Sequence, residues 1–125
     1  MSELTANVNW IAVIVGFVAA YGFGWIWYGP LFGKPWSSAL GLKIPDKLPV
    51  LAMATQAVGT FLLAWLAGVT AVSNHLATFI LAVLMVVALM KANAFYSGRP
   101  MRALTIEIGY VIAMAVIVVA AQAIF

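Results

Sequence analysis

Long apolar runs separated by short polar stretches are the main pattern of this sequence. The charge-free runs lie between Glu3 and Lys34, between Lys47 and Lys91, and after Glu107. A transmembrane helix needs ~20 consecutive apolar residues, so the first and last runs each hold one span and the middle run holds two. The pattern predicts four transmembrane helices, at about residues 9–28, 48–69, 76–96 and 101–125.

The composition agrees with a chain that lies in a lipid bilayer. Hydrophobic residues make up 66% of the 125 positions and charged residues only 7%, whereas a soluble domain needs roughly a quarter. We therefore expect an all-α integral membrane protein, a four-helix bundle with a short interfacial segment between helices 1 and 2. A single transmembrane domain over residues 1–125 is expected, without a linker. The basic residues flank the helices, a pattern that sets orientation in the membrane and does not indicate binding to nucleic acid.

The loop between the first two spans carries the clearest boundary signals. Gly29-Pro30 is expected to end the first helix, because proline lacks a backbone donor and disfavours helical geometry in the preceding residue. Residues 35–41 begin with proline and end with glycine, which favours a short interfacial helix. Aromatic side chains with a polar tip suit the membrane–water boundary, so we expect this location for Trp25, Trp27, Tyr28 and Trp36.

Small residues recur every four positions on the first two spans. They form one face at Gly16, Ala20 and Gly24 and another at Thr60, Ala64 and Gly68. Within lipid, small residues let helix backbones approach closely, so the two faces are expected to join helices 1 and 2 within one subunit. A homodimer face is the alternative interpretation.

Four polar side chains are expected to form a layer inside the membrane. Lys91 lies in the last turns of the third span and Glu107 in the second turn of the fourth, so both sit ~8–9 Å below the helix ends in an antiparallel hairpin. Ionisable groups at this depth are costly and usually pair. We expect a Lys91–Glu107 ion pair, with Gln56 and Tyr110 completing the cluster. The cluster either locks helix 3 against helix 4 or forms a proton or solute site entered from the cytoplasm.

The sequence carries no enzymatic or metal-binding signature. The chain has no cysteine, which excludes disulfides, thiolate nucleophiles and metal sites with cysteine ligands. It has no phosphate-binding loop, no His-Glu-x-x-His and no suitable pair of carboxylates. His75 is the only histidine and lies at a helix end, where a solvated or capping role is expected. We expect no catalytic residue, no metal and no cofactor.

Several stretches resemble a known protein family. They are Asn9-Trp-Ile-Ala with Gly24-Trp-Ile-Trp-Tyr-Gly-Pro-Leu-Phe-Gly-Lys-Pro-Trp36, and Phe95-Tyr-Ser-Gly-Arg-Pro100 with Ile106-Glu-Ile-Gly-Tyr110. They are similar to the two signatures of small bacterial membrane proteins grouped as domain-of-unknown-function 1761, and the resemblance covers nearly the whole chain. It implies a four-helix membrane fold. The family has no assigned activity, so no catalytic residue is implied.

Three function classes remain. The first is a non-enzymatic membrane protein that self-associates or serves as an accessory subunit of a larger membrane complex, favoured by the small-residue faces and the shortage of aqueous loops. The second is a small proton-coupled transporter or channel that uses the Lys91/Glu107 site. The third is an enzyme acting on lipid, which ranks last because only Glu107, Lys91 and His75 are available to it.

Lysine and arginine fall on one side of the predicted bundle. All six lie in or beside the loops between helices 1 and 2 and between helices 3 and 4: Lys34, Lys43, Lys47, Lys91, Arg99 and Arg102. The positive-inside rule then places both loops in the cytoplasm. Both termini are expected on the outer, periplasmic side of a bacterial inner membrane.

Overall fold

The computed structural model describes residues 2–41 and 50–125, and this part of the chain is helical without strands. Lys43 and Lys47 lie outside the described residues. The long helices are α2 (Trp10–Ile26), α4 (Val50–Val72), α5 (Leu76–Ser97) and α6 (Met101–Ile124). The short elements are α1 (Ser2–Thr5), the π-helical turn η1 (Trp27–Leu31) and α3 (Gly33–Leu40).

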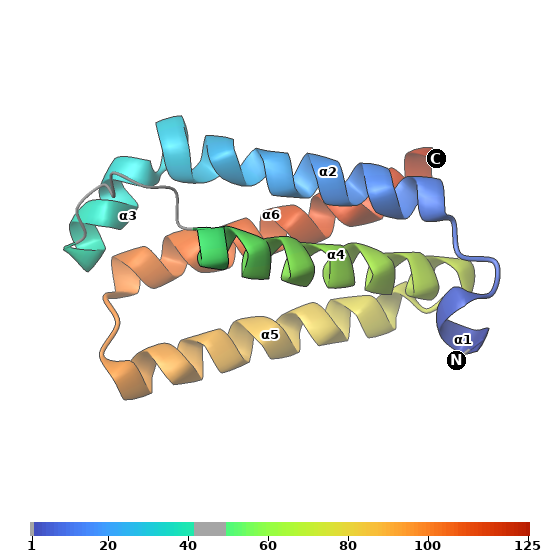
Figure 1. Cartoon of the computed structure of the whole chain (residues 1–125). Helices are drawn as coiled ribbons and strands as arrows, with labels where there is room; N and C mark the ends of the chain where they lie inside the picture. Colours follow the sequence, from blue (N-terminus) through green and yellow to red (C-terminus); the bar gives the residue numbers. More distant parts are fainter. Residues whose placement is uncertain (1, 42–49) are drawn as a thin grey trace.

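Four segments of the described chain are long and apolar enough to cross a membrane. They are α2 continued through η1, and helices α4, α5 and α6. The predicted all-α membrane bundle is therefore confirmed, with α3 in the place of the expected interfacial segment. Figure 1 shows both termini at the same end as the α4–α5 turn, while α3 and the α5–α6 turn lie at the other end.

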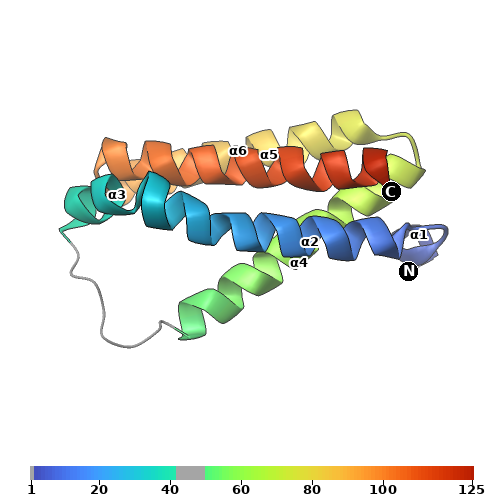
Figure 2. The same cartoon turned by 90° about the horizontal axis from the view of Figure 1, so that it is seen from above.

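The helices are not packed equally. Helix α6 contacts α2, α4 and α5, and it holds the longest run of buried side chains among the described elements. Helix α5 buries only Phe79 and Ala94. Figure 2 shows α4 crossing the bundle obliquely, so that its Val50 end diverges from the other long helices. The bundle is thus close-packed near the termini and open near α3.

The Gly29-Pro30 pair does not end the first helix as abruptly as predicted. The backbone widens into η1, in which Gly29 has φ −105° and ψ −105° and Pro30 lies inside the turn. The Phe32 amide donates to the Trp27 carbonyl at 2.9 Å, which closes a ring one residue wider than an α-helical one. Because glycine tolerates this conformation and proline donates no hydrogen bond, the chain bends here into α3 without a loop.

The small face of α2 packs on α6, and the prediction that it joins α4 was wrong. A Cβ atom added at Gly16 would lie 3.2 Å from Ala121 Cβ, and one added at Gly24 would lie 2.5 Å from the Tyr110 hydroxyl. Ala20, between them, is fully buried. The face is therefore intramolecular, as preferred over a homodimer face, but its neighbour is the helix most distant in the sequence.

The second small face lies against two helices. A Cβ atom at Gly68 would meet Val13 Cγ2 at 2.8 Å. The Thr60 hydroxyl lies 3.5 Å from the Met114 sulfur on α6, and Ala64 is 1% exposed. Small residues on α4 thus let it approach α2 and α6 together, near the terminal end of the bundle.

Candidate functional site: two cavities around Glu107

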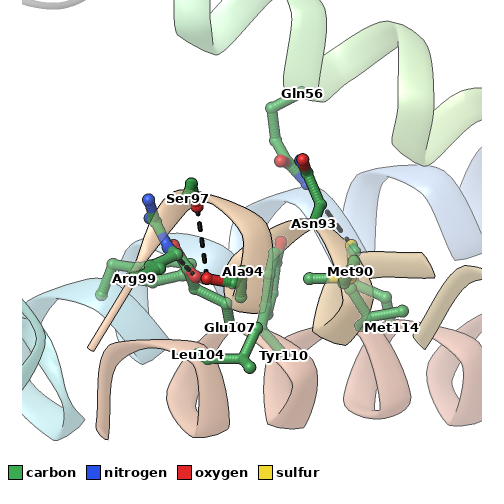
Figure 3. A pocket seen from close by; sticks show the side chains of 12 residues that line it. Gln56, Met90, Asn93, Ala94, Ser97, Arg99, Leu104, Glu107, Tyr110 and Met114 are labelled. Atoms are coloured by element: carbon green, nitrogen blue, oxygen red, sulfur yellow. Dashed lines mark hydrogen bonds and ion pairs between the residues drawn. The ribbon is translucent and has the colours of Figure 1, made fainter. Parts of the chain in front are cut away.

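Two cavities lie side by side at the open end of the bundle. The first, the α4–α5 cavity, has a volume of about 310 Å³ and is lined mainly by α5 and α6, with Gln56 from α4 (Figure 3). The second, the α2–α4 cavity, has about 450 Å³ and is lined by α2, η1, α3, α4 and α6. Four residues border both: Tyr28, Gln56, Glu107 and Tyr110.

Glu107 is the carboxylate between the two cavities, and Arg99 holds it. The Arg99 Nε donates to Oε1 at 2.7 Å, and a second guanidinium nitrogen donates to Oε2. Trp36 Nε1 on α3 also donates to Oε2, at 3.2 Å. The Glu107 side chain is 16% exposed and that of Arg99 is 37% exposed. The hydrogen bond to Glu107 raises the pKa of the Arg99 guanidinium, so Arg99 stays protonated.

The predicted Lys91–Glu107 ion pair is replaced by Arg99–Glu107. Lys91 is exposed and does not line either cavity. One residue turns a helix by about 100°, so Lys91 points away from the cavity-lining strip of Met90 and Asn93. Arg99 instead follows Gly98, whose φ of 69° reverses the chain and brings the guanidinium back over the start of α6.

Tyr110 anchors α6 to α2 at the wall between the cavities. Its hydroxyl donates to the Ala20 carbonyl at 2.8 Å, and the side chain is buried. The Tyr28 ring stands edge-on to Tyr110, with centroids 5.4 Å apart, and edge-on to Trp36, with centroids 5.0 Å apart. Trp27 Nε1 donates to the Ile106 carbonyl at 2.9 Å. Aromatic contacts thus fix η1 and α3 against α6.

The four aromatic residues expected at the membrane boundary differ in their surroundings. Trp25 is 59% exposed on the outside of α2, as an interfacial residue would be. Trp27, Tyr28 and Trp36 are half-buried and contact residues of α6. The clustering of these aromatic residues at the end of the first span predicts the membrane boundary, but it does not predict their contacts with α6.

Gln56 is in the α4–α5 cavity, as a member of the predicted cluster. Its Nε2 donates to the Thr60 hydroxyl at 3.1 Å and to the Met114 sulfur at 3.6 Å. Figure 3 shows the side chains of Gln56 and Asn93 pointing toward one another from α4 and α5. Gln56, Glu107 and Tyr110 therefore do come together, while Lys91 does not.

The sequence analysis did not assign Asn93 or Arg99 to the site. It placed Trp36 at the membrane boundary but did not predict its hydrogen bond to Glu107. A signal for Arg99 existed, because it lies in a tight Gly-Arg-Pro reversal eight residues before Glu107. Within residues 2–41 and 50–125, no group of three histidine or acidic side chains is placed to hold a metal ion. His75 is exposed at the start of α5, at the opposite end of the bundle.

Comparison with known proteins gives one match. Neither a curated protein nor a solved structure is similar enough to the chain to count as a relative. The sequence profile of a family described as protein of unknown function (DUF1761) matches residues 11–122, which cover nearly all of the four long helices and every lining residue of both cavities. The resemblance noted in the two sequence signatures is thereby confirmed, and this chain, with its four apolar helices long enough to cross a membrane, belongs to this family of proteins of unknown function.

Proposed function

We propose that this is a non-enzymatic integral membrane protein that works by association with other membrane helices. It either self-associates or serves as an accessory subunit of a larger complex. One observation supports this most: Gln56 and Asn93 are exposed, yet they lie on membrane-spanning helices and point into the α4–α5 cavity. Polar groups facing lipid tails are costly, so such side chains normally face another helix or water.

The weak attachment of α5 favours the same proposal. Only Phe79 and Ala94 of this helix are buried, while α6 buries side chains along its whole length. A partner helix that lies across the α4–α5 cavity would contact both amides. Hydrogen bonds between helices in membranes involve such Asn and Gln side chains and contribute ~0.6–2 kcal/mol each.

Cysteine cross-linking tests this proposal directly, because the chain has no native cysteine. We expect Asn93→Cys to form a disulfide-linked dimer in native membranes if the protein self-associates. Ala92→Cys is the matched control, since this preceding residue on α5 is rotated by about 100° from Asn93 and does not line the cavity. A mild-detergent pulldown with mass spectrometry identifies an accessory role, as one co-purifying membrane protein. The proposal would be contradicted if no dimer formed and no membrane protein co-purified.

A second candidate function is a small proton-coupled transporter or channel. It is favoured by the position of the Glu107 carboxylate, which borders two cavities on different sides of α4. Lys91 has no role in this candidate function, because Glu107 is paired with Arg99. Proton or solute flux into proteoliposomes, lost in Glu107→Gln and kept in Glu3→Gln, would support this candidate over the first.

For orientation, we propose a bacterial inner membrane with the α3 end in the cytoplasm. Lys34 lies in α3, Lys91 in the last turns of α5, Arg99 in the α5–α6 turn and Arg102 at the start of α6. These segments are at one end of the bundle in Figure 1, and the termini are at the other. Basic residues favour the cytoplasmic side, so the termini are expected in the periplasm.

A further inference from the structure

We propose that the α2–α4 cavity binds an organic cation, meaning an ammonium or phosphonium group carried on an apolar body. No part of the proposed association requires this cavity to be occupied. Its volume of about 450 Å³ falls within the range of small-molecule sites. Two features of its lining, the aromatic walls and the single carboxylate, select the charge of the ligand.

The walls of the cavity are rich in aromatic rings. Five of the lining residues are tryptophan or tyrosine: Tyr21, Trp25, Tyr28, Trp36 and Tyr110. Tyr28 stands nearly perpendicular to both Trp36 and Tyr110, at interplanar angles of 65° and 75°, so the rings form a corner and not a flat stack. The face of an aromatic ring is electronegative and attracts a cation within ~6 Å, most strongly where water is excluded.

The Arg99–Glu107 ion pair borders the α2–α4 cavity through its carboxylate only. Glu107 lines both cavities, whereas Arg99 lines only the α4–α5 cavity. The α2–α4 cavity therefore borders the negative end of the pair and not the positive end. A cation placed there would meet the carboxylate in a cavity that Arg99 does not line, while an anion would meet the carboxylate and the aromatic rings without a cation in the lining.

Apolar groups and an exposed rim complete the site. Ala52 and Met53 of α4 line one side of the cavity, and Gly24 of α2 also lines it. Trp25, at the rim, is 59% exposed on the outer surface of α2. An amphiphile in the bilayer could thus place its charged group among the rings and leave its apolar part near lipid. The charged group belongs either to a free lipophilic cation or to the amine headgroup of a lipid.

The test uses two probe ions of the same shape and opposite charge, tetraphenylphosphonium and tetraphenylborate. The protein is held in nanodiscs of phosphatidylglycerol, empty nanodiscs are subtracted, and binding is followed by calorimetry and tryptophan fluorescence. We expect saturable binding of the phosphonium and binding of the borate at least about tenfold weaker. Equal binding of the two ions would overturn the proposal.

Two charge variants should shift the affinity in opposite directions. Glu107→Gln removes the negative charge and is expected to weaken phosphonium binding at least about tenfold, the range for a charged contact. Arg99→Gln removes the competing cation and is expected to tighten binding. Glu3→Gln, a carboxylate outside the site, should change nothing. A merely structural role of the pair would weaken binding in both variants, which would contradict the proposal.

A pair of substitutions at Trp36 keeps the test valid if a charge variant unfolds. Trp36→Phe retains an aromatic face but loses the donor to Glu107, and it should bind the phosphonium more tightly than Trp36→Leu does. Trp36→Leu loses the ring face and should bind about threefold to tenfold more weakly. Equal affinities in the two variants would exclude the aromatic wall as a binding element.

A comparison of two lipids distinguishes a lipid headgroup from a free lipophilic cation as the natural ligand. In nanodiscs of phosphatidylethanolamine, a headgroup amine that occupies the site should compete with the phosphonium and lower its apparent affinity. Unchanged affinity relative to phosphatidylglycerol would identify a free lipophilic cation as the ligand. Absence of phosphonium binding in both lipids would overturn the proposal altogether.

Discussion

The Tyr110 hydroxyl donates a 2.8 Å hydrogen bond to the Ala20 carbonyl, across two helices that are ninety positions apart in sequence. The bond forms because Gly24, one turn after Ala20, leaves the space that the phenol occupies. A Cβ atom at Gly24 would lie 2.5 Å from the hydroxyl oxygen and 2.9 Å from Cζ. One glycine therefore decides how closely α2 and α6 approach at the open end of the bundle.

Substitution of Gly24 tests this close approach. Gly24→Ala should destabilise the protein by about 1–3 kcal/mol, the usual cost of overpacking, because the tyrosine ring must move. Gly22→Ala is the matched control, since nothing lies within 4 Å of its added Cβ, and it should be neutral or stabilising by up to about 1 kcal/mol. Unfolding in a mild detergent measures both. Equal effects would show that the α2–α6 contact is looser than described.

The buried small face of α2 gives a second prediction. Ala20 is 0% exposed, so Ala20→Leu should force α2 away from α6 and lower the free energy of unfolding by about 1–3 kcal/mol or more. Ala19→Leu, on the exposed neighbouring position, should change it by less than about 0.5 kcal/mol. If Ala20→Leu left stability unchanged and instead converted an oligomer to a monomer, the face would be intermolecular.

A double-mutant cycle tests the partner of Glu107. Arg99→Gln and Glu107→Gln should be coupled by about 0.5–2 kcal/mol, between the values for exposed and buried ion pairs, because Arg99 is partly exposed. Lys91→Gln should add independently to Glu107→Gln. The measurement is the free energy of unfolding of each single and double variant. If Glu107 were coupled to Lys91 and not to Arg99, the Lys91–Glu107 ion pair expected from the sequence would be correct.

Reporter fusions test the proposed orientation. A fusion at Phe125 is expected to be active as alkaline phosphatase and dark as green fluorescent protein, because the C-terminus lies opposite the basic end. A truncated fusion after Gly98, in the α5–α6 turn, should give the reverse pattern. Fluorescence of the fusion at Phe125 would show that the C-terminus is in the cytoplasm and that the proposed orientation is wrong.

The approximate extents of the long helices could be predicted because they depend on local properties of the chain, although α4 runs to Val72, past its expected end at residue 69. A span needs enough apolar residues to cross the bilayer and must satisfy its own backbone hydrogen bonds, and both conditions are visible in the sequence. Residues 97–100, the short gap between the third and fourth predicted spans, form the α5–α6 turn for a similar reason: only glycine readily takes the φ of 69° found at Gly98. At Gly29-Pro30 the same reasoning located the bend but missed its form as a π-helical turn.

Which faces and side chains meet depends on how the helices pack. The sequence predicted that Glu107 belongs to a polar layer near the basic end of the spans. Its partner depends on the rotation of α5 about its axis, which turns Lys91 outward, and on the backbone at Gly98, which returns Arg99. The small face of α2 likewise had two possible neighbours of similar apolar character. Shape complementarity with Tyr110 and Ala121 selected α6, and such complementarity has no one-dimensional signature.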